Sequence, residues 1–143
     1  MSKDTALNAP VVERPVPVPD AATEPYWNAA REHRLVMPRC MDCGRYHFYP
    51  RTLCPYCSSS RLEWTQCSGL GTVYSFTVVH RAPSPAFAAE APYIVAVVEL
   101  DEGTRLMTNI TGCAPDAVRV GAKVRVTFRQ LSGPVTLPVF EPL

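Results

Sequence analysis

The 143-residue sequence has little that would point to a membrane or to a nucleic acid. Hydrophobic residues make up 47% of it, yet no apolar run approaches the ~20 residues that a membrane-spanning helix needs. An excess of charge of one sign is also lacking, because fourteen Lys and Arg stand against thirteen Asp and Glu, with the signs interspersed. A dedicated nucleic-acid binder usually carries a basic stripe that neutralises phosphates, and this sequence offers none.

The N-terminal sequence and the chain length limit where the protein works and how large a core it can build. The N-terminus lacks the basic-then-apolar order of a secretory signal, so we expect a cytoplasmic protein. Without an export signal, the six cysteines are better interpreted as reduced thiols than as disulfides. The length suits one ordinary domain, or a small metal-stapled module plus a barrel of about 70 to 80 residues. We therefore expect metal and partner contacts to matter for stability.

Four of the six cysteines form two closely spaced pairs. Cys40 and Cys43 make the first Cys-x-x-Cys pair, and Cys54 and Cys57 make the second. This spacing puts four soft thiolates at the tips of two tight turns, as a tetrahedral Zn²⁺ requires. We predict a structural zinc ribbon over residues 38–66, with these cysteines as the metal ligands.

Two other uses of these thiolates stay open. Four thiolates also suit a rubredoxin-type iron site, and the Cys54 and Cys57 pair alone would fit a thiol redox motif. The redox motif needs a helix N-terminus after a strand in a βαβ unit, which nothing here supplies. A catalytic zinc normally has three protein ligands and a water, and four cysteines leave no open position. His47 is then interpreted as exposed or stacking, and residues 46–49 as a β-hairpin arm between the two turns.

The chain before the cysteines divides into an arm and a helix. Prolines at alternating positions in residues 1–20 forbid a helix or a central strand and leave polyproline II or disorder. This flexible, proline-rich arm is either a tail or a segment that becomes ordered on a partner. Residues 21–37 are predicted as an N-terminal helix, with Thr23 as N-cap, Pro25 in the first turn and Pro38 as the stop.

The predicted helix has one aromatic and apolar face. Tyr26 and Trp27 combine with Ala30, Arg34 and Leu35 at roughly helical spacing. Such a face either packs on the protein's own core or docks on another subunit. Because the core behind the helix is small, docking of this face on another subunit stays open as the second interpretation.

From residue 67 onward the hydrophobic pattern has a period of two. Val124, Val126 and Phe128 alternate with charged or polar residues, as a half-buried strand demands. Five short antiparallel strands with glycine at the corners suit an OB-type Greek-key barrel over residues 67–143, and an SH3-like barrel is the alternative. The predicted fold class is mainly β: a helix, a zinc ribbon and a five-stranded OB-fold barrel. The predicted strands are 72–79, 93–100, 105–110, 123–129 and 137–140.

No residue in the barrel region makes a convincing catalytic group. Cys67 and Cys113 are isolated and are interpreted as small buried hydrophobic residues. A triad of His80 with Ser75 or Glu90 is conceivable, but no nucleophile-elbow context accompanies it. We therefore predict no catalytic site in this chain.

The order of the motifs resembles the DUF35 family. The match runs from about residue 24 to the C-terminus. It implies a rubredoxin-like zinc ribbon followed by an acyl-CoA-associated OB-fold. After the helix, the motifs are Leu35-Val-Met-Pro-Arg-Cys40-x-x-Cys43-Gly44, Phe48-Tyr-Pro50-Arg51, Cys54-Pro-x-Cys57, Gly69-x-Gly71-Thr-Val-Tyr74, Pro92-Tyr93, Val98-Glu-Leu-Asp-Glu-Gly103 and Val120-Gly121.

The resemblance also implies a function. Members of this family resemble accessory subunits of thiolase-like enzymes: archaeal acetoacetyl-CoA thiolase with HMG-CoA synthase, phloroglucinol-type acyltransferases, aromatic-succinyl-CoA thiolases and steroid side-chain aldolases. It implies that a partner supplies the catalytic residues, while this chain binds and stabilises the partner and can help shape its CoA channel. The alternative is an OB-fold module for single-stranded nucleic acid, against which the near-neutral charge argues.

The connection from Arg81 to Pro92 exceeds the usual length of about two to six residues. It is either a plain barrel connection or, with an exposed Phe87, a contact for the partner or for the pantetheine arm of CoA. Four arginines of the barrel could meet CoA phosphates, but charged residues on alternating strands usually form the solvated face. These arginines are Arg81, Arg105, Arg125 and Arg129.

Overall fold

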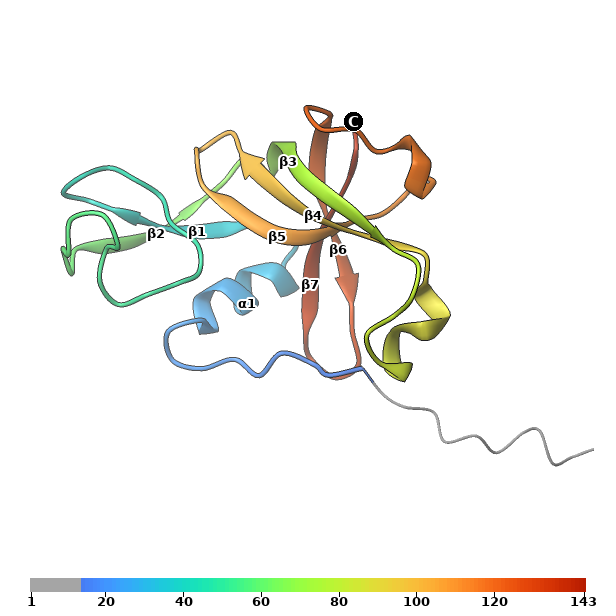
Figure 1. Cartoon of the computed structure of the whole chain (residues 1–143). Helices are drawn as coiled ribbons and strands as arrows, with labels where there is room; N and C mark the ends of the chain where they lie inside the picture. Colours follow the sequence, from blue (N-terminus) through green and yellow to red (C-terminus); the bar gives the residue numbers. More distant parts are fainter. Residues whose placement is uncertain (1–13) are drawn as a thin grey trace, which may run out of the picture.

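The structure, a computed structural model, describes residues 14–143, so the first thirteen residues of the predicted arm lie outside the described residues. Residues 14–20 form neither helix nor strand, and Figure 1 shows them running alongside helix α1. Within the described range, no helix is both long enough and apolar enough to cross a membrane.

Helix α1 spans Glu24–Arg31 and is shorter than the helix predicted over residues 21–37. Thr23 occupies the N-cap position, but its hydroxyl makes no cap bond and instead donates to Oδ1 of Asp20 at 2.9 Å. The helix ends early because His33 has a φ of 59°, a left-handed conformation in which a right-handed helix cannot continue.

The ribbon is built on two strands on either side of the cysteine turns. Strand β1 (Val36–Cys40) pairs antiparallel with β2 (Leu62–Gln66). Pro38, predicted to stop the helix, lies inside β1. The prediction of a hairpin arm at residues 46–49 is wrong, because β1 takes its partner from beyond the second cysteine pair. That segment retains only an isolated bridge to Arg39.

The remaining five strands close a barrel in the order β3-β4-β5-β7-β6 (Figure 1). This closed Greek-key order confirms the predicted OB-fold. The prediction of wholly antiparallel pairing is wrong at one seam, where β5 and β7 pair in parallel at Ile110 and Phe140. The strands are β3 (Leu70–Val79), β4 (Tyr93–Leu100), β5 (Arg105–Ile110), β6 (Lys123–Gln130) and β7 (Thr136–Pro142), with 3₁₀ turns η1 (Pro85–Glu90) and η2 (Pro115–Ala117).

Gly71 allows the barrel to close. It lies on β3 between Leu100 of β4 and Val124 of β6. A Cβ at this position would lie 2.7 Å from the carbonyl oxygen of Glu99, closer than real Cβ atoms approach. The strands can approach this closely only because residue 71 has no side chain.

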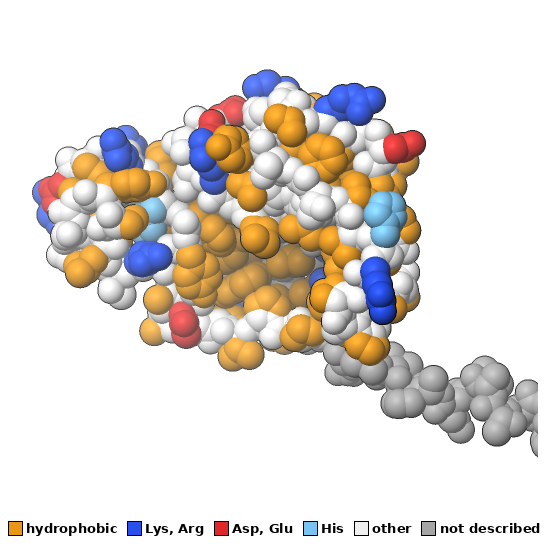
Figure 2. Space-filling view, viewed as in Figure 1, with side chains coloured by type: hydrophobic (Ala, Val, Ile, Leu, Met, Phe, Trp, Pro, Cys, Tyr) orange, Lys and Arg blue, Asp and Glu red, His pale blue; other side chains and the backbone are white. Residues whose placement is uncertain are grey.

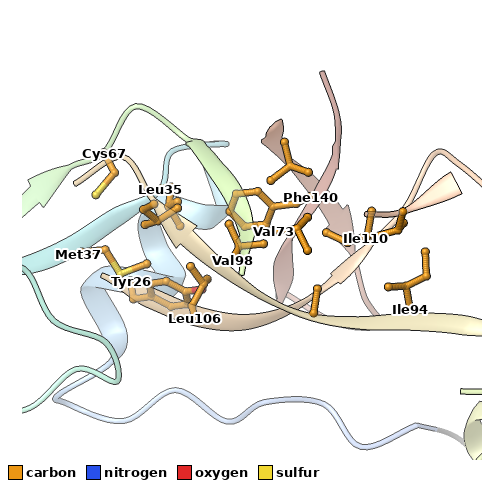
Figure 3. Packing of buried hydrophobic residues seen from close by; sticks show 14 residues of the cluster. Tyr26, Leu35, Met37, Cys67, Val73, Ile94, Val98, Leu106, Ile110 and Phe140 are labelled. Carbon is orange, nitrogen blue, oxygen red and sulfur yellow. The ribbon is translucent and has the colours of Figure 1, made fainter. Parts of the chain in front are cut away.

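One cluster of buried side chains joins the barrel, the helix and the ribbon stem, which is the β1–β2 strand pair (Figure 3). Figure 3 shows Tyr26 of α1 and Met37 of β1 beside Leu106 of β5, with Phe140 farther along the same core. Met37 and Phe140 are fully buried. Because ribbon and barrel share one core, a change that unfolds the ribbon also exposes part of the barrel's apolar surface.

The aromatic face of α1 packs on the protein's own core. Tyr26 and Ala30 are buried, whereas Trp27 is only partly covered. The Tyr26 ring meets Trp27 edge-on at a centroid distance of 5.0 Å. The helix therefore contributes to the core through Tyr26 and still presents Trp27 at the surface.

Candidate metal centre

The four paired cysteines come together in one cluster. Their sulfur atoms all lie within 4.8 Å of one another. The Sγ atoms of Cys40 and Cys57 are 3.5 Å apart, and those of Cys43 and Cys54 are 3.6 Å apart. A tetrahedron with Zn–S bonds of ~2.3 Å has edges of about 3.8 Å, so the spacing fits a four-thiolate metal site. The four cysteines are thus positioned to bind a metal ion.

Two turns of the same form carry the two pairs. In each, the N–H four residues after the first cysteine donates to that cysteine's carbonyl oxygen: Gly44 to Cys40 at 2.8 Å and Ser58 to Cys54 at 2.9 Å. Gly44 and Ser58 both have left-handed φ angles, 76° and 64°. Glycine adopts this conformation freely, whereas a residue with a side chain does so at a cost of about 1–2 kcal/mol. The repeated turn shows that the backbone itself presents the sulfurs.

The ionisation of the cluster shows why it favours a cation. The backbone N–H of Cys43 donates to Sγ of Cys40 at 3.4 Å and, as the largest influence, lowers the pKa of Cys40 to about 6. The N–H of Ser59 favours the Cys57 thiolate, but the Cys40 sulfur and desolvation together raise the pKa of Cys57 to about 12. The Cys40 thiolate therefore forms readily, whereas Cys57 resists a second negative charge beside it. A bound dication would stabilise all four thiolates at once.

His47 is buried, and the prediction of an exposed or stacking side chain is wrong. Its side chain is 2% exposed, and neither ring nitrogen has a hydrogen-bond partner among the described residues. Burial and the positive charge of Arg51 lower the pKa of His47, so the imidazole is neutral at pH 7. It does not belong to the sulfur cluster. Its burial escaped prediction because an irregular segment between two turns has no hydrophobic period.

The residues considered for a catalytic triad do not come together in the structure. Glu90 binds Arg14 and Arg129 and makes no hydrogen bond to His80 or Ser75, which are both exposed. Within the described range, no Ser–His–carboxylate arrangement is therefore formed. The isolated Cys67 is buried as predicted, whereas the isolated Cys113 is only partly buried.

Cys67 should resist alkylation in the folded protein. Burial raises the pKa of its thiol to about 12. At pH 8 its thiolate is about a thousand-fold scarcer than that of a free cysteine, and burial slows attack further. We expect iodoacetamide at pH 8, followed by peptide mass mapping, to modify Cys113 well before Cys67. Labelling of Cys67 in native protein as fast as in guanidinium-unfolded protein would contradict its buried position.

The barrel arginines form surface ion pairs, as the solvated-face interpretation predicts. Arg105 binds Glu99 at 2.8 Å and Arg125 binds Glu141 at 2.8 Å. Arg81 is exposed. The carboxylates of Glu99 and Glu141 thus offset the charges of Arg105 and Arg125, which does not favour a role for these two arginines in binding nucleic-acid phosphates.

A cavity of about 620 Å³ opens between helix α1, the ribbon and the barrel. Figure 2 shows it as a hollow lined by hydrophobic side chains at the centre of one face. Trp27 contributes from α1, Tyr49 from the ribbon, and Met107 from β5. Phe87 of η1 was predicted to be exposed. It is partly buried instead and lines the cavity. Sequence patterns missed the cavity because its walls come from segments far apart in the chain, from Arg14 to Pro138.

Fold and site together define a class of protein, a four-cysteine metal ribbon fused to an OB-fold barrel. Residues 27–63 match the family "ChsH2, rubredoxin-like zinc ribbon domain", and residues 64–129 match "ChsH2, C-terminal OB-fold domain". A "DUF35 domain-containing scaffold protein" of Methanocaldococcus jannaschii is 38% identical over 107 residues, which cover 73% of this chain and 75% of the relative. The chain belongs to the DUF35 family.

Other relatives are larger or belong to assemblies. A "Probable enoyl-CoA hydratase alpha subunit" of Thermomonospora curvata is 41% identical over 93% of this chain, but the chain spans only 41% of that protein. A "Benzoylsuccinyl-CoA thiolase subunit BbsA" of Geobacter metallireducens is 30% identical over 69% of this chain and 62% of that protein. A solved structure titled "Ltp2-ChsH2(DUF35) aldolase" has a TM-score of 0.79 and 41% identity, covering 89% of this chain and 98% of that one.

Proposed function

We propose that this chain is a non-catalytic accessory subunit that binds and stabilises a thiolase-superfamily acyl-CoA enzyme. The observation that carries the proposal is the closed cluster of four sulfur atoms on a fold shared with the structure titled "Ltp2-ChsH2(DUF35) aldolase". We assign structural Zn²⁺ to this cluster, with Cys40, Cys43, Cys54 and Cys57 as its ligands. Bound there, the ion supplies folding free energy and no reactive position, because four protein ligands fill its tetrahedron.

The relatives of this chain support a role beside another enzyme. They include a scaffold protein, a thiolase subunit and a component of an aldolase assembly. We propose that the partner supplies the catalytic residues and that its CoA thioester passes along the interface with this chain. We also propose a cytoplasmic location, where thiolates stay reduced and available to the metal.

Co-expression tests the subunit role. A tagged form of this chain is produced together with a thiolase-like reading frame from its genomic neighbourhood, and the complex is captured and sized. We expect the two chains to co-purify in a fixed ratio with one zinc per DUF35 chain, and iron in place of zinc would support the rubredoxin-type alternative. A partner that is soluble, fully active and never retained by this chain would refute the proposal.

The η1 loop gives a narrower test. Replacing residues 84–90 with a Gly/Ser segment of equal length removes Phe87 and Glu90 while keeping the β3–β4 connection closed. Because this loop lines the cavity, we expect roughly ten-fold weaker partner binding or a similar rise in the KM for the acyl-CoA. Circular dichroism and zinc content serve as folding controls. Unchanged affinity together with unchanged KM would exclude a contact role for the loop.

A further inference from the structure

The cavity has the residue composition of a protein interface. Aromatic residues, methionine and arginine are enriched at the cores of such interfaces, and this cavity contains all three kinds. Tyr26 meets Phe48 at a centroid distance of 5.6 Å, and Phe48 meets Tyr49 at 5.7 Å. This chain of aromatic contacts leads from the buried core to the rim, so the wall is preorganised before anything binds.

Two large apolar side chains stand exposed at the rim. Met107 of β5 is 72% exposed and Tyr49 of the ribbon is 57% exposed. Exposed apolar surface beside an apolar hollow is stabilised when a partner covers it, by about 25 cal/mol for each Å² removed from water. Methionine is flexible and adapts to the surface that packs on it. The rim therefore favours an occupant broad enough to cover both side chains.

One end of the cavity carries surplus positive charge. Arg14 donates to Glu90 at 3.1 Å, and Arg129 also binds this carboxylate. These three are the charged residues that line the cavity in the described part of the chain, so two positive charges face one negative charge. Nε of Arg14 is buried and has no hydrogen-bond partner among the described residues. A second carboxylate at this end would balance the charge and meet unused donors.

From these observations we infer that the cavity is the docking surface for the partner subunit, which inserts an apolar side chain and places an acidic side chain at Arg14 and Arg129. This inference rests on the proposed function and adds the surface and the chemistry of the contact. Met107 and Tyr49 line the hollow and also extend into solvent, so a small ligand inside it would cover them only in part. A polypeptide covers the hollow and its rim together.

Charge substitutions at the rim test the surface. The dissociation constant for the thiolase-like partner is measured with zinc-loaded wild-type chain and with Met107→Glu, Tyr49→Glu and Arg129→Gln. Val120→Glu is the matched control, because Val120 is 66% exposed and does not line the cavity. Tyr49 and Met107 come from the ribbon and the barrel respectively, so a folding defect in one variant leaves the other informative. Circular dichroism and melting temperature verify folding.

We expect Met107→Glu and Tyr49→Glu to weaken binding by about thirty-fold or more, because each would bury an unpaired charge against the apolar side chain of the partner. Arg129→Gln should weaken it by about five-fold and reduce the dependence of affinity on salt. Val120→Glu should stay within about three-fold of wild type, as surface positions outside an interface do. Tight wild-type binding that neither rim variant weakens would overturn this inference and leave the proposed function standing. Absence of wild-type binding would overturn both.

Other occupants give different results. If the rim variants abolish the fluorescence of 1-anilinonaphthalene-8-sulfonate bound to the free chain but leave partner affinity unchanged, the cavity takes a small molecule. If the free chain sediments as a dimer that Met107→Glu dissociates, with partner affinity unchanged, the occupant is a second copy. Either result would overturn the inference.

Discussion

Replacing Cys40 with serine should abolish stoichiometric zinc binding and unfold the ribbon. Cys40 ends β1, is fully buried, and contributes one of the four clustered sulfur atoms. Structural zinc in small domains contributes about 10–16 kcal/mol of apparent binding free energy, much of which is folding free energy. We therefore expect loss of several kcal/mol of stability in the Cys40→Ser protein and in the chelated wild type, measured by metal analysis and thermal unfolding.

Cys113→Ser is the matched control, because Cys113 lies outside the sulfur cluster. It should keep one zinc per chain and melt near the wild-type temperature. The ribbon stem shares its core with the barrel, so the metal-free protein should also lose affinity for the partner. A metal-free protein with an unchanged melting profile would show that the cluster is not what holds the ribbon together.

Replacing Phe140 with alanine should destabilise the barrel by about 3–5 kcal/mol, the range for truncation of a buried phenylalanine. The side chain of Phe140 is fully buried on β7, at the one position where β5 and β7 pair in parallel. Its carbonyl oxygen accepts a hydrogen bond from the N–H of Thr111 at 2.8 Å. Loss of the ring therefore leaves a cavity at the seam that closes the barrel.

Leu143→Ala is the control for this change, since Leu143 lies close in sequence but is largely exposed. Its effect should stay within about 0.5 kcal/mol, as for most surface substitutions. Both variants are measured by denaturant unfolding with zinc bound. Equal stability of the two variants would mean that the β5–β7 seam is not packed as described.

The regular parts of the fold were predictable because their signals are local. The bounds predicted for β4 (Tyr93–Leu100) and β5 (Arg105–Ile110) agree with the observed ones. Pro92 marks the start of the first hydrophobic run, and the turn around Gly103 separates the two runs. The two Cys-x-x-Cys pairs likewise predict the sulfur cluster, since their spacing alone sets two tight turns.

The errors arose where a segment's partner lies far away in the chain. The segment 46–49 has strand-forming residues, but β1 pairs with β2 instead. The parallel contact of β5 with β7 depends on the closed barrel, which no local period encodes. The early end of the helix has a different, local cause: the chain leaves the helix after Arg31 because His33 adopts a left-handed conformation, and histidine carries no breaker signal in the sequence.

The candidate site shows the same division. The metal cluster comes from short, local motifs and was predicted, whereas the cavity and the buried His47 come from the meeting of helix, ribbon and barrel. Burial of Tyr26 and exposure of Met107 are likewise tertiary outcomes. The residues that we infer to meet the partner could therefore be found only in the folded protein.

Reconstitution of the partner's activity is the most direct test of the subunit role. Purified thiolase-like enzyme is assayed with its acyl-CoA substrate while zinc-loaded DUF35 chain is added in increasing amounts. We predict weak turnover by the enzyme alone, none by this chain alone, and a rise that saturates at a fixed molar ratio. Full activity of the enzyme alone, unchanged by any amount of added chain, would show that the chain is not its accessory subunit.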